Sequence, residues 1–194
     1  MAGLTASGTL PAMPYDVPPE LAAMSLEDIA RAVEERRLPP IESWNPTESV
    51  DSGMVISANG TWLHDGQPIR RPAMVRAFAS LLMRDAEGRH WLVTPQCRQS
   101  IAVEDAAFIA VDVQCKGDAL AFRLNSDELV LAGPDHPLRA AGDPETPAIY
   151  LAVRHGCEAR LDRSTWLQMV DLAEVDGDTL TVTSRGTRFS LFPA

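Results

Sequence analysis

Several things are scarce in this 194-residue chain, and each scarcity excludes a class of protein. Lysine occurs once, at Lys116, and acidic residues outnumber basic ones by 27 to 17, which gives a net charge of −10. Binding of nucleic acid needs clustered Lys and Arg to displace counterions from phosphates, so we expect no nucleic-acid partner. No apolar run approaches the roughly 18 residues that span a bilayer, so we expect no membrane partner.

Cysteine and enzyme motifs are also rare. The three cysteines lack CxxC spacing, which favours free thiols in a reducing cytoplasm over a disulfide framework or a structural zinc site. The first residues have neither the basic nor the apolar part of a secretory signal, so we expect a cytoplasmic location. No P-loop, dinucleotide-binding glycine pattern, HExxH, EF-hand or GxSxG string occurs, so no cofactor or metal is predicted. An enzyme is therefore the less favoured interpretation, although it stays open.

Local patterns predict mixed α and β structure. Residues 1–40 are expected to form a flexible arm followed by an amphipathic helix over Leu26–Arg37, where Ser25 and Asp28 form a capping box. Asn59-Gly60 predicts a hairpin with a type I′ turn. A second helix is predicted over Pro72–Arg84, because proline suits the first helical turn and apolar residues follow at helical spacing.

A pattern in Trp91–Leu131 recurs about sixty residues later in Tyr150–Leu191, which indicates a tandem repeat. Matched positions include Cys97 with Cys157, Val111-Asp112 with Val170-Asp171, and Gly117-Asp118 with Gly177-Asp178. Each copy reads as two hairpins joined at a bridging segment. The second copy departs from the first over Ser164–Ala173, where the spacing is helical.

These patterns together predict an α+β fold, in which the amphipathic helix precedes two related β-rich units that each carry a packed helix. The predicted first unit covers residues 41–132 and the second covers residues 148–194. Residues 133–147 contain four prolines and two glycines, so we expect a linker there.

The candidate binding residues lie at predicted strand ends and turns. The adjacent carboxylates of Glu104 and Asp105 could coordinate a cation or divide acid and base roles, or they could form a solvated turn. Several arginines could present a concave surface to an anion, or they could balance nearby surface acids. The predicted ligand-binding residues are Arg71, Thr94, Arg98, Glu104, Asp105, Arg154 and His155.

Three functions are compatible with this pattern. We favour a non-catalytic small-ligand-binding or regulatory module, which binds a small anionic ligand in the groove between the two units. The first alternative is a metal-assisted hydrolase that uses Glu104 and Asp105, with His90 or His155 assisting. The second is a structural interaction module for a protein partner, with a homodimer as one form of it.

The strings IESWNP at Ile41–Pro46 and VEDA at Val103–Ala106 resemble the bacterial domain-of-unknown-function family 1285, and the resemblance runs over residues 41–192. It implies an α+β fold built from repeats and a role in signal transduction, and it assigns no catalytic residues. Gln96 stands where the family pattern leads us to expect an acid after LVTP. Ala107 stands where we expect the proline of VEDAPF. The resemblance therefore implies a fold more firmly than it implies the details of a site.

Overall fold

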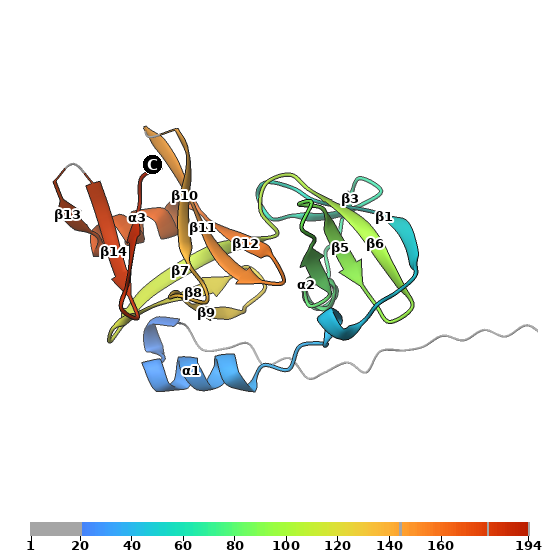
Figure 1. The fold of residues 1–194 in the computed structure, drawn as a ribbon, viewed down its shortest axis with the longest axis horizontal. Helices are drawn as coiled ribbons and strands as arrows, with labels where there is room; N and C mark the ends of the chain where they lie inside the picture. Colours follow the sequence, from blue (N-terminus) through green and yellow to red (C-terminus); the bar gives the residue numbers. More distant parts are fainter. Residues whose placement is uncertain (1–20, 144, 178, 194) are drawn as a thin grey trace, which may run out of the picture.

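The computed structural model of this protein describes residues 21–143, 145–177 and 179–193. The predicted flexible arm, which ends near Pro19, lies outside these residues. Within them, the strands form two six-stranded sheets and one three-stranded sheet, and three α-helices accompany the sheets (Figure 1). The predicted α+β class is confirmed.

The first sheet consists of two antiparallel groups of three strands, with the order β3-β2-β1-β6-β5-β4. The groups meet where β1 runs parallel to β6. Helix α2, Pro72–Ala79, connects β3 to β4. The strands are β1 Glu48–Ile56, β2 Trp62–His64, β3 Gln67–Pro68, β4 Leu82–Arg84, β5 His90–Val93 and β6 Cys97–Val103.

The second sheet has the order β10-β11-β12-β7-β8-β9, and its two groups meet where β7 runs parallel to β12. Helix α3, Arg163–Leu172, and a three-stranded antiparallel sheet follow it. The strands of the second sheet are β7 Phe108–Lys116, β8 Ala119–Leu124, β9 Leu129–Leu131, β10 Leu138–Asp143, β11 Thr146–Arg154 and β12 Cys157–Leu161. The strands of the third are β13 Glu174–Asp176, β14 Thr179–Ser184 and β15 Thr187–Ser190.

The two large sheets are a repeat, because the second has the strand order of the first when β7–β12 replace β1–β6. The predicted repeat is therefore confirmed in part. Its first half is right: the β5–β6 and β11–β12 hairpins are equivalent, and Cys97 and Cys157 begin equivalent strands. Its second half is wrong, because Val111 lies in β7 whereas Val170 lies in α3.

The predicted division at residue 132 is corrected by the strand pairing. Strands β7–β9, which the prediction gave to the first unit, share a sheet with β10–β12 through the pairs Phe108–Ala159 and Ala110–Leu161. The expected linker contains β10, which pairs with β11 along its length. Proline and glycine there shape a hairpin within the sheet and separate no domains. We call residues 41–106 the first domain and residues 107–193 the second domain.

The predicted helices differ from the observed ones mainly in length. Helix α1, Leu26–Glu35, has the expected capping box, in which the Asp28 backbone N–H donates to Ser25. Helix α2 ends at Ala79 and not at Arg84, because the next apolar residues enter the sheet as β4 and pair with β5. No helix in the described part of the chain has the length and apolar character needed to cross a membrane.

One continuous hydrophobic core extends through both domains. It includes Trp62 and Leu92 from the first sheet and Phe108 and Phe122 from the second. Helix α1 precedes the first domain in sequence but packs on the second sheet, beside β9 (Figure 1). Its Ile29 is buried with Leu129 in a separate cluster. The two domains are therefore packed as one body.

A buried ionic junction lies where α1, α2 and the second sheet meet. The Glu128 side chain is 7 % exposed, and its carboxylate forms ion pairs with Arg36, at 2.9 Å, and with Arg154. Arg154 also donates to the carbonyl oxygen of Ala79 at 2.9 Å, and its guanidinium lies over the ring of Phe108. Arg154 therefore links the two domains directly.

Two turns carry further contacts between the domains. The His155 carbonyl oxygen at the β11–β12 turn accepts a hydrogen bond from the Arg84 backbone N–H at 2.8 Å. The β1–β2 turn packs its Gly60 against Ile109 and Asn125 of the second domain. Gly60 has a φ of +82° and Asn59 does not adopt positive φ, so the predicted type I′ turn is wrong although the hairpin is present. The turn that is present instead is the one that contacts the second domain through Gly60.

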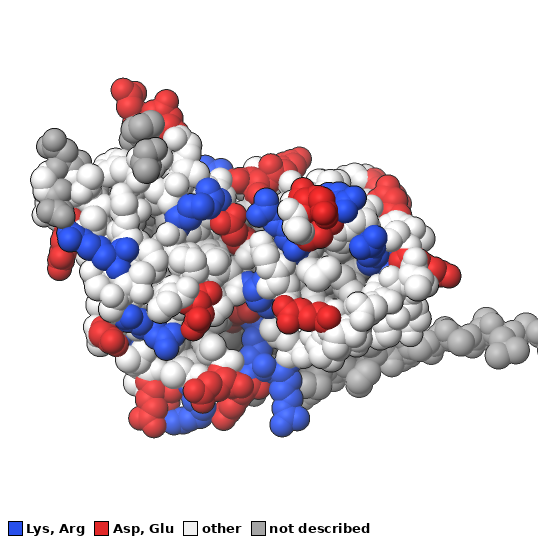
Figure 2. Space-filling model, viewed as in Figure 1, with Lys and Arg blue, Asp and Glu red and all other residues white. Residues whose placement is uncertain are grey.

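Basic and acidic side chains are interspersed over the face drawn in Figure 2, and several basic ones lie along the junction of the two domains. This face carries no extended area of a single charge sign. Ionic contacts between neighbours, such as Arg139 with Glu158 and Arg89 with Asp85, account for many of these charges.

Replacement of Arg154 by alanine is expected to lower the free energy of unfolding by about 2–4 kcal/mol, because it removes a buried side chain that pairs with Glu128, donates to Ala79 and lies over Phe108, although Arg36 still pairs with Glu128. Urea unfolding of both proteins measures the difference. Arg163 is the matched control, because it is exposed and has no ion-pair partner among the residues that the structure describes, and its alanine variant should change stability by no more than about 0.5 kcal/mol. A loss below about 1 kcal/mol for Arg154→Ala would contradict the assigned role.

Gly156→Ala is expected to destabilise the protein more than Gly66→Ala. Both glycines have positive φ, +74° and +75°, so alanine costs about 1–2 kcal/mol at either position. At Gly156 the added methyl carbon would also lie 2.8 Å from the Arg84 carbonyl oxygen, whereas nothing lies within 4 Å at Gly66. Thermal unfolding of the two variants measures the comparison, and equal midpoints would show that the turn does not press against β4.

Candidate functional site

The seven predicted ligand-binding residues do not converge on one site. Arg71 is exposed at the start of α2 and lines neither of the pockets described below. Thr94 closes the β5–β6 turn, where its hydroxyl donates to the Cys97 carbonyl oxygen at 2.8 Å. Arg98 lies on the first sheet and stacks over Trp91. These three residues therefore have separate local roles.

Arg154 and His155 lie at the domain junction, and both are already engaged. Arg154 is 10 % exposed and its charge is compensated by Glu128, so it is not available to an anion entering the groove. The ring Nδ1 of His155 lies 2.8 Å from the carboxylate of Glu42. The sequence pattern placed these residues correctly between the domains, but burial gives Arg154 a structural role.

Glu104 and Asp105 form the link between the two sheets and point to different partners. Glu104 accepts a hydrogen bond from the Ala58 backbone N–H at 2.9 Å and so ties the link to the β1–β2 turn. Asp105 accepts from the Tyr150 hydroxyl at 2.7 Å and from Arg160 at 2.5 Å. The hydrogen bond to Asp105 raises the pKa of Arg160, while burial and the same carboxylate raise the pKa of Tyr150.

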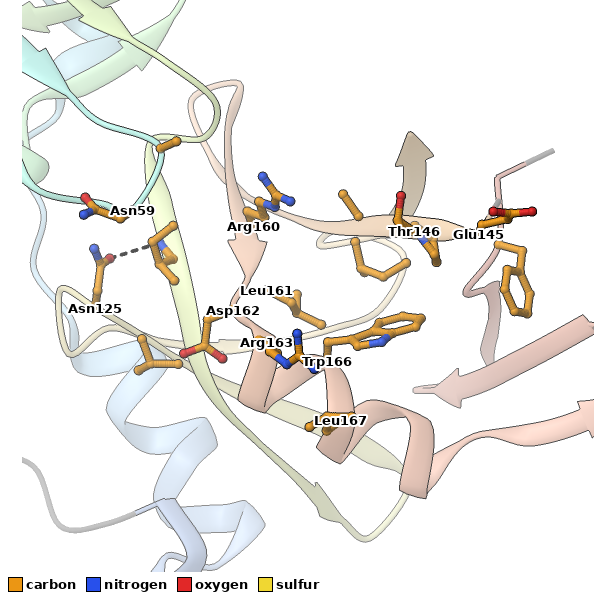
Figure 3. A pocket seen from close by; sticks show the side chains of 17 residues that line it. Asn59, Asn125, Glu145, Thr146, Arg160, Leu161, Asp162, Arg163, Trp166 and Leu167 are labelled. Carbon is orange, nitrogen blue, oxygen red and sulfur yellow. Dashed lines mark hydrogen bonds between the residues drawn. The ribbon is translucent and has the colours of Figure 1, made fainter. Parts of the chain in front are cut away.

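The larger pocket, of about 810 Å³, lies between the β1–β2 turn, the second sheet and α3. Figure 3 shows Arg160 on β12 and the ring of Trp166 on α3 on different sides of this space. Apolar side chains supply much of its wall, with polar groups from both domains at its edges. The lining includes Asn59, Ile149, Arg160, Arg163, Trp166 and Phe192.

The chemistry of this larger pocket suits a ligand with an apolar part and a negative charge. Trp166 and Phe192 offer aromatic surface. The Arg160 side chain is 43 % exposed and pairs with Asp105, while the exposed Arg163 has no acidic partner in the described part of the chain. Guanidinium groups so placed can donate bidentate hydrogen bonds to a carboxylate or phosphate.

The smaller pocket, of about 170 Å³, also lies between the domains. Its lining comes from β4 and β5 of the first domain, from the link, and from β10–β12 of the second domain. Here the Arg139 guanidinium makes two hydrogen bonds to the Glu158 carboxylate, at 3.1 and 3.0 Å, and lies 4.5 Å from the ring centre of Tyr150. The lining residues are Arg84, His90, Asp105, Ala106, Ala107, Arg139, Tyr150 and Glu158.

The residues suggested for metal chemistry do not form a cluster of three ligands, although His90 and Asp105 both line the smaller pocket. Across residues 21–143, 145–177 and 179–193, no three His, Cys, Asp or Glu side chains are grouped to hold a metal ion. Burial raises the pKa of Cys157 to about 12, so its thiol stays protonated at neutral pH.

Sequence reasoning missed Arg160 and Trp166, and neither has a local signal for its role. The β11–β12 hairpin turns at His155-Gly156, and Arg160 lies opposite Tyr150 only because the strand register shifts between Ala152 and Arg154. Both side chains then reach Asp105. Trp166 lies in the segment Ser164–Ala173, for which helical spacing was predicted, and its place at the pocket wall depends on tertiary contacts.

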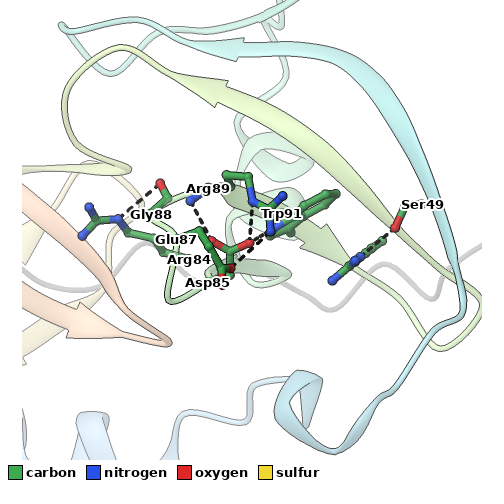
Figure 4. Close-up of polar contacts among 8 residues, drawn as sticks. Ser49, Arg84, Asp85, Glu87, Gly88, Arg89 and Trp91 are labelled. Carbon is green, nitrogen blue, oxygen red and sulfur yellow. Dashed lines mark hydrogen bonds and ion pairs between the residues drawn. The ribbon is translucent and has the colours of Figure 1, made fainter.

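A stacked cluster on the first sheet is centred on Trp91, which Figure 4 shows beside Arg89. The guanidinium of Arg98 lies 4.5 Å from the Trp91 ring centre, and that of Arg89 lies 5.5 Å from it. The Trp91 Nε1 donates to Asp85 at 2.8 Å. Although burial acts to raise it, hydrogen bonds from Trp91 and Arg89 lower the pKa of Asp85 to about 2.

This lowered pKa predicts a pH-dependent contribution to stability. Asp85 binds its proton more weakly in the folded than in the unfolded chain, so the stabilisation is complete above the unfolded pKa of about 4 and declines as the pH falls toward about 2. The stability difference between wild type and Asp85→Asn, measured by urea unfolding, should therefore shrink across that interval. A difference that stays constant there would contradict the prediction.

Comparison with known proteins places the chain among relatives of the same fold. Two family models match the chain in succession. The first is the N-terminal domain of the domain of unknown function DUF1285, and it matches residues 39–106. The second is the C-terminal domain of the protein of unknown function DUF1285, and it matches residues 107–191. A crystal structure of a DUF1285 family protein from Silicibacter pomeroyi DSS-3 is similar, with 40% identity, a TM-score of 0.75 and coverage of 89% of this chain and 97% of that chain.

A second similar crystal structure is that of a DUF1285 family protein from Shewanella baltica OS155, with 22% identity and a TM-score of 0.52. The match covers 61% of this chain and 90% of that chain, and it shows a likeness of fold. None of the curated proteins matches this chain. The boundary between the two family models, after residue 106, falls between β6 and β7, where the first sheet ends and the second begins. The chain belongs to the DUF1285 family.

Proposed function

We propose that this protein is a non-catalytic small-ligand-binding module, that its site is the larger pocket between the domains, and that its ligand is a small organic anion. The observation that carries the proposal is the pocket of about 810 Å³, in which aromatic walls face Arg160 and Arg163. Binding sites for small molecules combine a concave, mainly apolar wall with a few polar groups that orient the ligand. Both parts of that description apply here.

The placement of Arg160 gives the ligand a way to act on the protein. An anion that binds Arg160 competes with Asp105, which also holds Tyr150. Asp105 belongs to the link between the two sheets, so occupancy of the pocket acts on the connection between the domains. We therefore propose a regulatory role in bacterial signal transduction in the cytoplasm, in which a bound metabolite alters this connection.

A protein-interaction role is the second candidate, and exposed apolar residues favour it. Leu167 on α3 is 54 % exposed and Val175 on β13 is 77 % exposed. Large apolar side chains on neighbouring surface elements are typical of contact surfaces. Sedimentation of the protein as a dimer that Leu167→Glu dissociates would support this second function.

Thermal unfolding against a panel of small organic anions tests the first proposal, because a compound that binds only the folded state raises the midpoint by mass action. We expect some member of the panel to raise it. Arg160→Gln and Arg163→Gln should each weaken that compound about ten- to a hundredfold by calorimetry, since a hydrogen bond to a charged group contributes about 1.5–3 kcal/mol.

Arg70→Gln is the matched control, because Arg70 is exposed and lines neither pocket. It should bind the compound as tightly as wild type. Retention of full affinity by both Arg160→Gln and Arg163→Gln would overturn the assignment of the site. A panel without any midpoint shift would count against a small anionic ligand and would favour the protein-interaction role.

A further inference from the structure

The smaller pocket differs from the larger one in size and charge, and Asp105 stands between them. One carboxylate oxygen of Asp105 accepts from Tyr150, which lines the smaller pocket, and the other accepts from Arg160, which lines the larger one. The smaller pocket has a volume of about 170 Å³, against about 810 Å³ for the larger one, so it suits a smaller ligand.

Arg84 is the uncompensated cation of this smaller pocket. Among the described residues, no carboxylate lies within 4.0 Å of its guanidinium, and its Nε makes one long hydrogen bond of 3.5 Å to the Gly88 carbonyl oxygen. Its backbone N–H is held by His155, so its position at the junction is fixed. Figure 4 shows its side chain extending away from the Asp85–Arg89 network. Most of its donors are therefore available to a ligand.

The other charges of the pocket cancel in pairs. Arg139 is bound to both carboxylate oxygens of Glu158, and Asp105 is paired with Arg160. Burial, together with the charge of Arg84, lowers the pKa of His90, so its ring is neutral at neutral pH and still offers one N–H donor. The pocket thus carries one unbalanced positive charge, which suits a ligand with a single negative charge.

The wall of this pocket is mainly polar, because the two alanines that line it, Ala106 and Ala107, are only 4 % and 1 % exposed. A second charged group on the ligand would face no uncompensated partner there. This composition favours a monocarboxylate over a dicarboxylate or a cation.

We propose that the smaller pocket is a second binding site, which takes a small monocarboxylate through Arg84 and His90. Arg84 supplies a planar pair of donors that matches the two oxygens of a carboxylate. This site is separate from the larger pocket, and the proposal does not depend on the function proposed for that pocket.

Saturation-transfer NMR on the full chain tests this inference with propionate, succinate and propylamine as probes at millimolar concentration. We expect saturation of propionate, weaker saturation of succinate, and none of propylamine. Arg84→Gln should weaken propionate by at least about tenfold, which is the loss of one charge-assisted hydrogen bond. His90→Gln is a second variant and should weaken propionate in the same direction.

Arg89→Gln is the matched control, because Arg89 lies on the same hairpin but pairs with Asp85 and Glu87 outside the pocket. It should bind propionate as wild type does. Absence of propionate saturation in wild type, or unchanged affinity in Arg84→Gln, would overturn the inference. Loss of propionate binding in Arg163→Gln, with binding retained in Arg84→Gln, would overturn it as well, by placing the probe in the larger pocket.

Discussion

A carboxylate buried between two guanidiniums fixes the arrangement of this molecule. Glu128 precedes β9, Arg36 follows α1, and Arg154 ends β11, so the three charges bring together segments that are far apart in the chain. Arg154 extends the junction to Ala79 in the first domain. An unpaired charge in such a place costs several kcal/mol, so each member of the set depends on the others. This dependence keeps the two repeated sheets in one relative position.

A fixed relative position gives the two pockets between the domains a preformed shape, which lowers the entropy that a ligand loses on binding. Asp105 connects them, because it holds Tyr150 on one side and Arg160 on the other. The link between the sheets is thus also the partition between two places where an anion could bind. In the function that we propose, a small molecule acts on the protein at this partition.

The sequence predicted the features that depend on near neighbours in the chain. The capping box of α1 and the equivalence of Cys97 and Cys157 are local patterns, and the structure contains both. The parallel pairs β1–β6 and β7–β12 join distant segments and leave no such pattern, so the domain boundary was misplaced. Arg154 and Arg160 belong to the same hairpin and look alike in sequence. Arg154 is buried because the first domain covers it, whereas Arg160 lines the larger pocket. Sequence spacing does not reveal this difference in burial.

The central claim is that the Glu128–Arg154 contact holds the domains together, and a double-mutant cycle measures it most directly. Urea unfolding of Glu128→Gln, Arg154→Met and the double variant gives the coupling free energy of the pair. The account predicts that the double variant loses less stability than the sum of the single losses, by about 2 kcal/mol or more. Losses that add to within about 0.5 kcal/mol would contradict it, because they would show two independent surface residues instead of one junction.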